Sequence, residues 1–452
     1  MKRNPLSLIF AFVFIDLLGY SLFLPLLPYY AETLGARPWL VGFLIASNAL
    51  AQLIASPAIG RLSDRYGRRP LLIASIAGTL LSFLLLGLVE PLGSLLNRLT
   101  GGALGLGTAA LVMLFASRIF DGLTGGNIAL ARAYITDVTD EESRARGLGM
   151  IGAAFGLGFI VGPAMGGLLS TWAPATSIVA QVGLSRYAVP AFVAVLLAAL
   201  NLAGVLLWLP ESLVAARRAE MSKRRSHSIL SLPELLGALR RPRFGPLLHI
   251  AFVHSLAFAL FTANFALYTQ YRLGLSDRAT SYILTYVGLL VVLVQGLAIG
   301  RLTRRFRETW LVLGAAILMA PSLLAWAVVP NVPLLLVILA PLALGGGVLN
   351  TVISSLVTKS VYPDEVGGAL GLSASLEALT RVLAPALGGV LIQQLGASSL
   401  GVVGGVLMIW LASFIWRRLV ANPDPPLPGR SDEMTARGAV LTTPTSSWGG
   451  EK

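Results

Sequence analysis

The chain has 452 residues, of which 56% are hydrophobic and only 12% are charged. A soluble domain carries roughly a quarter charged residues, so this chain has too little polar surface to cover a water-soluble fold. It has no cysteine and three histidines, which excludes disulfides and thiolate metal sites. We therefore expect a membrane protein with no metal site, no catalytic site and no cofactor.

Twelve apolar runs follow one another along the chain, and each is long enough to cross a bilayer as a helix. They lie at about 7–30, 38–59, 71–91, 106–134, 145–171, 187–209, 245–270, 277–299, 309–329, 332–357, 367–395 and 399–420. The first run follows two cations and lacks a small-residue cleavage site, so we interpret it as a retained helix and not as a signal peptide. The runs predict an all-α membrane protein with 12 transmembrane helices.

The net charge of +13 is concentrated in short clusters between the apolar runs. This distribution argues against nucleic acid as a partner and is typical of loops on one membrane face. The even-numbered loops and both ends of the chain hold most of the cations, which predicts a multi-pass protein of the plasma or inner membrane with both termini in the cytoplasm. The predicted parts are a six-helix bundle (1–210), a basic cytoplasmic linker (211–243), a second six-helix bundle (244–420) and a disordered cytoplasmic tail (421–452).

The two halves carry related sequences. Residues 163–169 (PAMGGLL) match 385–391 (PALGGVL), and 60–63 (GRLS) match 300–303 (GRLT). Each match falls at corresponding places in a period of six helices. Repeats of this kind place the substrate site at their interface, near the middle of the bilayer.

Five ionisable residues fall near the middle of predicted spans: Asp16, Arg118, Asp121, Glu377 and Arg381. Charges at this depth are costly, so each is a candidate for proton coupling. Arg118 with Asp121, or Glu377 with Arg381, could instead be self-neutralising pairs that lock helix packing. Asp16 has no cation within one turn, and a low-dielectric site disfavours its charged form, so we expect it to load and release protons. We expect Arg118 to be its partner across the cavity.

Several amides also lie within predicted spans, where they could line a substrate cavity or serve as hydrogen-bond links between helices. These are Asn48, Gln52, Asn127, Asn264, Gln295 and Asn350. Arg132, near a helix end, is expected to extend its side chain to the interface and carries no predicted role.

Several motifs are similar to those of the major facilitator superfamily, and specifically of its twelve-helix drug/proton antiporters. Residues 60–69 (GRLSDRYGRR) resemble the signature between helices 2 and 3, and Arg118 with Gly122 resembles the helix 4 motif. A helix 5 signature is also present. It consists of Gly149, Gly158, Gly162, Pro163, Gly166 and Gly167. Residues 133–140 (AYITDVTD) are similar to the tetracycline-resistance (TetA-like) branch in particular.

The resemblance implies the major facilitator fold, with two pseudo-symmetric six-helix bundles. It also implies a cytoplasmic gating network that holds the outward-facing state. The residues assigned to this network are Gly60, Asp64, Arg65, Gly67, Arg68, Asp137 and Arg144.

The second half departs from the tetracycline pumps. The resemblance implies a His in helix 8 and an Asp in helix 9 that serve the metal–drug complex in those pumps. By rough alignment, this chain has Val291 and Ile317 at these two positions. We therefore do not expect a metal–tetracycline substrate.

The leading hypothesis is a proton-driven antiporter that exports small amphipathic compounds or drugs by alternating access. Its partners would be a small-molecule substrate, protons and the bilayer, and the chain would act as a monomer. A proton symporter or uniporter for a sugar or other metabolite is the alternative, although the complete helix 5 motif weighs against it. A non-transporting membrane receptor or scaffold is a third reading, and an enzyme is not expected.

Overall fold

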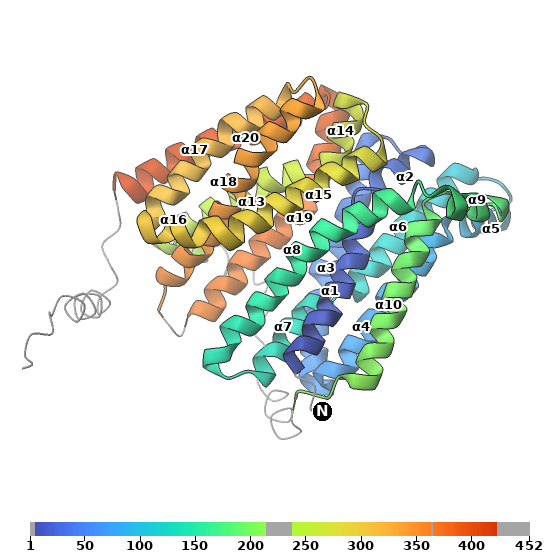
Figure 1. Ribbon diagram of the computed structural model, residues 1–452, viewed down its shortest axis with the longest axis horizontal. Coiled ribbons are helices and arrows are strands. Elements are labelled where there is room, and N and C mark those ends of the chain that lie inside the picture. Colours follow the sequence, from blue (N-terminus) through green and yellow to red (C-terminus); the bar gives the residue numbers. More distant parts are fainter. Residues whose placement is uncertain (1–4, 214–236, 363–364, 423–452) are drawn as a thin grey trace, which may run out of the picture.

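The computed structural model describes residues 5–213, 237–362 and 365–422, and all regular elements within these ranges are helices (Figure 1). Twelve stretches are long and apolar enough to cross a membrane, which confirms the predicted helix count. They are α1 (Pro5–Phe23), α3 (Pro38–Tyr66), α4 (Arg68–Gly87), α6 (Leu106–Thr124) with α7 (Asn127–Val138), α8 (Glu141–Leu169), α10 (Ala188–Trp208), α13 (Phe244–Ala263), α15 (Asp277–Leu293) with η1 (Val294–Ala298) and α16 (Ile299–Arg305), α17 (Glu308–Ala327), α18 (Val332–Lys359), α19 (Val366–Leu395), and α20 (Ser398–Ile415) with η2 (Trp416–Val420).

Four shorter helices connect the spans at one end of the molecule. They are α2 (Leu27–Thr33), α5 (Val89–Leu99), α9 (Ala173–Gln181) and α14 (Phe265–Leu273). The sequence analysis had merged the first and last of these with neighbouring spans and had left the other two in loops. The fourth span is also interrupted, because Gly125 and Gly126 separate α6 from α7. This break places Asn127 at the start of α7, at the level of the polar residues of α1.

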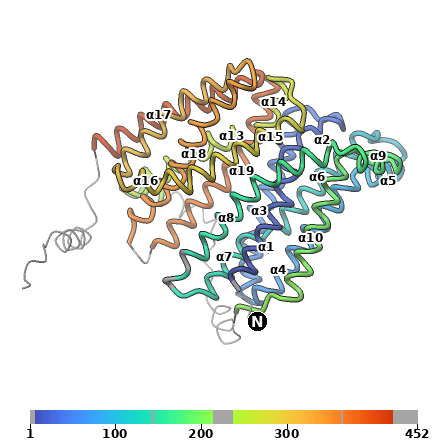
Figure 2. Tube along the Cα trace, in the orientation of Figure 1, coloured from blue at the N-terminus to red at the C-terminus, as the bar shows by residue number. Residues whose placement is uncertain are grey.

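The helices form two groups with equivalent packing. In the first half α1 packs on α8 and α10, and in the second half α13 packs on α19 and α20. Figure 2 shows the blue-to-green chain on one side and the yellow-to-red chain on the other. The boundaries at 210 and 244 stay a prediction. Most of the proposed linker and tail (214–236 and 423–452) lie outside the described residues.

The two halves meet at one end, which we call the closed end and which carries α2 and α14. There α3 packs on α19, and α8 packs on α15. A Cβ on Gly42 would lie 2.3 Å from the Pro385 carbonyl oxygen, and one on Gly167 would lie 2.7 Å from Ser281 Cβ. Toward the other ends of α8 and α19, and in α16 beyond α15, a Cβ on Gly149, Gly152, Gly371 or Gly300 would meet no atom within 4 Å. The halves therefore diverge away from the closed end.

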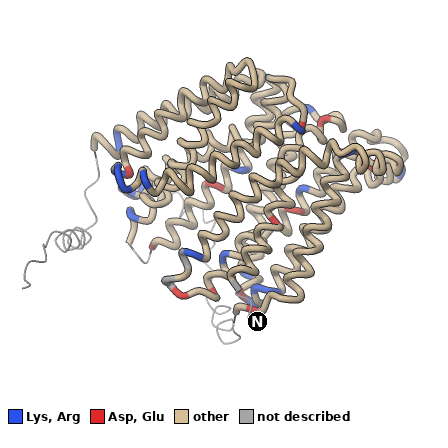
Figure 3. Tube along the Cα trace, viewed as in Figure 1, with Lys and Arg blue, Asp and Glu red and all other residues tan. Residues whose placement is uncertain are grey.

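Basic residues gather at the opposite end, which we call the basic end (Figure 3). Arg65, Arg68, Arg305 and Lys359 all lie in or near the terminal turns of helices there.

The glycines of α8 make a prediction about stability. A Cβ on Gly166 would lie 2.1 Å from the Leu22 carbonyl oxygen of α1, whereas one on Gly149 would meet nothing within 4 Å. Since backbone cannot yield as a flexible side chain does, we expect Gly166→Ala to lower the free energy of unfolding by about 1–3 kcal/mol. The matched Gly149→Ala should be neutral or slightly stabilising. Thermal unfolding of the purified variants in detergent checks this, and equal behaviour of the two variants would contradict it.

Candidate functional site

The first half holds a polar cluster at the middle of its spans, built around Asp16 of α1. The Asn127 amide donates a hydrogen bond of 2.6 Å to Asp16 Oδ1 and a second one of 3.2 Å to Thr79 Oγ1. Asn127 is buried and Asp16 is half-buried. The break between α6 and α7 brings this amide to the carboxyl group.

Arg118 and Asp121 of α6 form a second part of this cluster. Their side chains are buried and make an ion pair of 3.5 Å. Asp121 also accepts hydrogen bonds from the Asn48 amide (2.9 Å) and the Ser82 hydroxyl (2.8 Å). The carboxylate of Asp121 is thus held by three helices, α3, α4 and α6.

The expected contact between Asp16 and Arg118 is wrong. Asp121 lies one turn from Arg118 on the same helix and takes its charge, while Asn127 supplies the hydrogen bond to Asp16. Asp16 instead experiences the negative charge of Asp121. The sequence analysis missed Asn127 as the partner because the helix break at Gly125–Gly126 had not been recognised.

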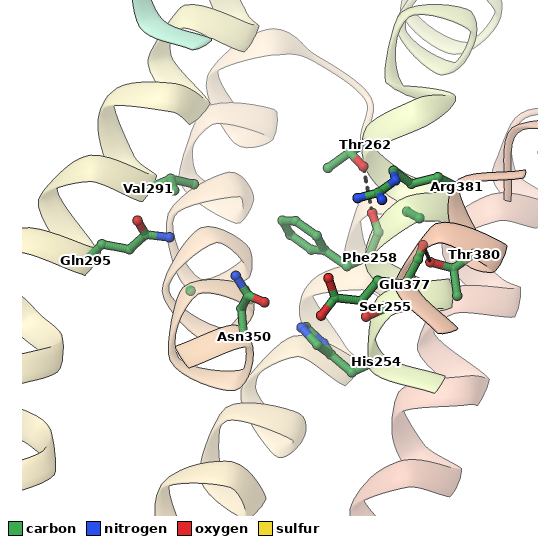
Figure 4. Close-up of a pocket in the computed structure, with 13 residues that line it drawn as sticks. His254, Ser255, Phe258, Thr262, Val291, Gln295, Asn350, Glu377, Thr380 and Arg381 are labelled. Atoms are coloured by element: carbon green, nitrogen blue, oxygen red, sulfur yellow. Dashed lines mark hydrogen bonds between the residues drawn. The ribbon is translucent and has the colours of Figure 1, made fainter. Parts of the chain in front are cut away.

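The second half contains a cavity of about 310 Å³ between α13, α15 with η1, α18 and α19 (Figure 4). Its lining combines apolar and polar groups: His254, Ser255, Phe258, Ala259, Thr262, Val291, Gln295, Gly346, Gly347, Asn350, Glu377, Thr380 and Arg381. Glu377 and Arg381 both face this space and interact electrostatically, but no ion pair within 4.0 Å joins them.

Two side chains of the first half act on these charges from across the molecule. Arg132 of α7 interacts electrostatically with Glu377, and the Tyr20 hydroxyl of α1 interacts with both Arg118 and Arg381. The assignment of no role to Arg132 therefore overlooked its proximity to Glu377. Only the packing of the two halves could have shown this, since nothing in the local sequence around Arg132 indicates it.

The amides divide between the two uses that were considered. Gln295 and Asn350 line the cavity, and Asn48 lines a smaller space of about 30 Å³ beside Tyr20 and Arg118. Gln52 donates to the Gly125 carbonyl, and the fully buried Asn264 donates to the Ala384 carbonyl. The latter two link helices, as Asn127 does, and the structure does not bring Asn264 to the cavity.

The two positions compared with the tetracycline pumps lie in different surroundings. Val291 lines the cavity, whereas Ile317 is 55% exposed on α17. The imidazole in the cavity comes from His254 of α13, which is buried, and its Nδ1 has no hydrogen-bond partner among the described residues. No role was predicted for this histidine from the sequence.

The expected charge network at the basic end is centred on Arg68. Its guanidinium contacts Asp64 at 2.6 Å and Asp137 at 3.0 Å. Glu211 accepts hydrogen bonds from the backbone N–H groups of Arg68 and Arg69 at 2.9 and 3.1 Å. The positive φ of Gly67 (110°) makes the turn that places Arg68 there.

Other members assigned to this network lie differently. Arg65 is exposed and its guanidinium lies over the Tyr66 ring. A Cβ on Gly60 would meet no atom within 4 Å, and the side chain of Arg144 lies outside the described residues.

The buried position of Arg68 makes a second prediction. The Asp137 side chain is only 5% exposed, so Arg68→Ala would leave a buried carboxylate without its cation. We expect the free energy of unfolding to fall by about 3–5 kcal/mol, the usual cost of breaking a buried ion pair. Arg65→Ala removes an exposed cation three residues away and should change it by less than about 0.5 kcal/mol. Thermal unfolding of both variants in detergent tests the contrast, which would be refuted by similar losses.

The closed end carries polar contacts between the halves. Arg186 makes an ion pair of 3.2 Å with the buried Asp277, and the Tyr29 hydroxyl shares a hydrogen bond of 2.7 Å with Thr280. Gln270 of α14 donates to Glu32 of α2. Burial raises the pKa of Glu32 above its ordinary value, against the effect of its hydrogen bonds. These contacts hold the closed end shut.

The helix 5 glycines serve two interfaces. A Cβ on Gly158, Gly162 or Gly166 would meet α1 at Leu17, Ser21 and Leu22, whereas one on Gly167 would meet α15 of the other half. Pro163 lies within the same stretch of α8.

Twelve spans in two equivalent groups that meet at one end, with a charged cavity among the spans of the second half, are the architecture of a polytopic membrane transporter. The family model of the Major Facilitator Superfamily matches residues 9–306 and 250–449. The chain belongs to this superfamily.

Similar proteins come from animals and bacteria. The chain is 30% identical over 395 residues to solute carrier family 22 member 18 of Mus musculus, covering 87% of this chain and 90% of that protein. It is 28% identical over 397 residues to the class C tetracycline resistance protein of Escherichia coli, covering 85% and 88%. The crystal structure of the human organic anion transporter MFSD10 superposes with a TM-score of 0.64 at 22% identity, covering 92% and 99%.

Proposed function

We propose that this transporter is a proton-driven antiporter that exports small amphipathic compounds. The observation that carries the proposal is the separation of charges between the halves. Asp16 of the first half has an amide and not a cation as its hydrogen-bond partner, while the largely apolar cavity with Glu377 and Arg381 belongs to the second half. A carboxyl group without a cationic partner at this depth can change its protonation state during a transport cycle.

The proposed cycle alternates between openings at the two ends. In the described state the halves touch at the closed end, whereas a Cβ on Gly149 or Gly152 of α8, or on Gly371 of α19, would meet no atom within 4 Å nearer the basic end. Rocking of one half against the other would break the Arg186–Asp277 contact and bring the basic ends together. Protonation of Asp16 would bias which opening is favoured.

The basic end is proposed to face the cytoplasm, following the excess of Lys and Arg in its loops. The described state is then open toward the cytoplasm, in a plasma or inner membrane. Resemblance to a tetracycline resistance protein is consistent with export, although Val291 in the cavity argues against a metal–drug complex as the substrate.

Everted membrane vesicles test this function. A preformed proton gradient, followed by a pH-sensitive dye, should partly dissipate when a transported member of a panel of amphipathic anions, cations and neutral compounds is added. Vesicles without the protein are the control. If no compound moves protons while the gradient remains intact, the antiport proposal is wrong, and uniport of a metabolite becomes the better reading.

A further inference from the structure

The cavity of the second half contains a guanidinium that makes no ion pair within 4.0 Å with a described acid. Arg381 is exposed to this space. No hydrogen bond or ion pair within 4.0 Å to any described residue holds its guanidinium. The other central arginine behaves differently, because Arg118 is paired with Asp121. A charged group at membrane depth is costly unless it has a partner, so Arg381 is suited to one that comes and goes.

Glu377 lies four residues before Arg381 on α19 and interacts with it electrostatically, but no ion pair within 4.0 Å joins the two side chains. In Figure 4 its carboxylate lies toward His254 and Asn350, whereas the Arg381 side chain lies toward Thr262. Glu377 also interacts with Arg132 from the first half. Two cations therefore surround one acid in this part of the site.

This charge balance discriminates between classes of ligand. A ligand amine placed at Glu377 would be repelled by Arg381 and Arg132, whereas a ligand acid at Arg381 would meet an unpaired guanidinium. Phe258, Ala259 and Val291 line the same cavity and provide an apolar surface for the body of the ligand.

We propose that the substrate is an amphipathic organic anion, and that Arg381 binds its acid group while its apolar body packs against Phe258 and Val291. This inference rests on the proposed function only in taking the cavity as the transport site. A hydrogen bond to a charged group contributes about 1.5–3 kcal/mol, so the anion should bind about tenfold to 150-fold more tightly than a neutral molecule of the same shape.

Three probes of one shape test the charge preference: naphthalene-1-sulfonate, naphthalene-1-sulfonamide and 1-naphthylmethylammonium. Their binding to the purified full chain in detergent is measured by calorimetric titration. We expect the sulfonate to bind at least tenfold more tightly than either of the others. In Arg381→Gln this preference should disappear. In Arg381→Lys it should persist but fall several-fold, because an ammonium lacks the bidentate fork. Arg98→Gln, at an exposed cation of α5, should leave it unchanged.

The inference is overturned if the wild type binds the sulfonamide or the ammonium as tightly as the sulfonate, or if folded Arg381→Gln keeps the preference. Thermal unfolding shows whether Arg381→Gln is folded. If it is not, the other two variants decide: the inference is overturned if Arg98→Gln loses the preference for the sulfonate, or if Arg381→Lys keeps it in full. The two proposals fail separately. Sulfonate binding without proton movement in vesicles contradicts antiport alone, whereas proton movement with the ammonium but not the sulfonate contradicts only the anion inference.

Discussion

Asp16→Asn is expected to abolish substrate-driven proton movement while leaving the exchange of substrate for substrate intact. The amide retains the size of the carboxyl group and can still form a hydrogen bond with Asn127, which lies 2.6 Å from Asp16 in the structure. It cannot carry a proton, so the step that couples protonation to the change of opening is lost. The expected decrease in proton flux is to the background of empty vesicles, with counterflow of labelled substrate reduced by less than about threefold, or 0.7 kcal/mol.

Glu365→Gln provides the matched control. It also replaces a carboxylate by an amide, but Glu365 is 40% exposed and forms an ion pair with Arg241, which is 58% exposed. Its proton flux should equal that of the wild type. Proton movement that survives in Asp16→Asn would show that another acid carries the proton, and Glu377→Gln would then be the variant to compare.

Gly42→Val is expected to shift the protein toward its alternative state, in which the two halves have separated at the end that is closed in the structure. A Cβ at this position would lie 2.3 Å from the Pro385 carbonyl oxygen and 3.1 Å from Gly389 Cα, so α3 and α19 must separate. Overpacking of this kind costs about 1–3 kcal/mol. If the whole cost falls on the closed state, the equilibrium between the two openings moves about 5–150-fold.

The absence of cysteine from the chain makes this shift directly measurable. Ser281, fully buried between the halves, is replaced by Cys and labelled with a membrane-impermeant maleimide added from the side of the closed end. The labelling rate should rise by the same factor in Gly42→Val. Gly314→Val on α17, where a Cβ would meet no atom within 4 Å, should leave it unchanged. An equal rate in all three proteins would mean that the contact between α3 and α19 does not control the opening.

Much of the fold could be predicted because the bilayer imposes a simple rule on the sequence. Each span must be continuously apolar to satisfy its backbone in lipid, and this gave the 12 helices directly. The repeated segments 163–169 and 385–391 fall on equivalent helices, α8 and α19. The short helices at the closed end were harder to predict, because nine or so residues carry too little periodic signal.

The charge contacts show where sequence reasoning stops. Arg68 with Asp64 is a pair at i, i+4, and spacing alone makes that contact plausible. Asp16 with Asn127, and Arg132 with Glu377, join residues more than a hundred positions apart, and only the packing of helices decides them. The sequence could name Asp16 and Glu377 as unusual, since charges at membrane depth are rare, but it could not say which partners they have.

Accumulation of substrate against its own gradient tests the central claim most directly. Proteoliposomes containing the full chain receive a stable gradient of one pH unit and the panel compound that moves most protons in vesicles. For one-for-one exchange with the membrane potential held at zero, one pH unit supplies about 1.4 kcal/mol. The wild type should then sustain a substrate ratio of about ten, and Asp16→Asn a ratio of about one. A wild-type ratio that never exceeds one while the proton gradient persists would contradict proton-driven antiport by this protein.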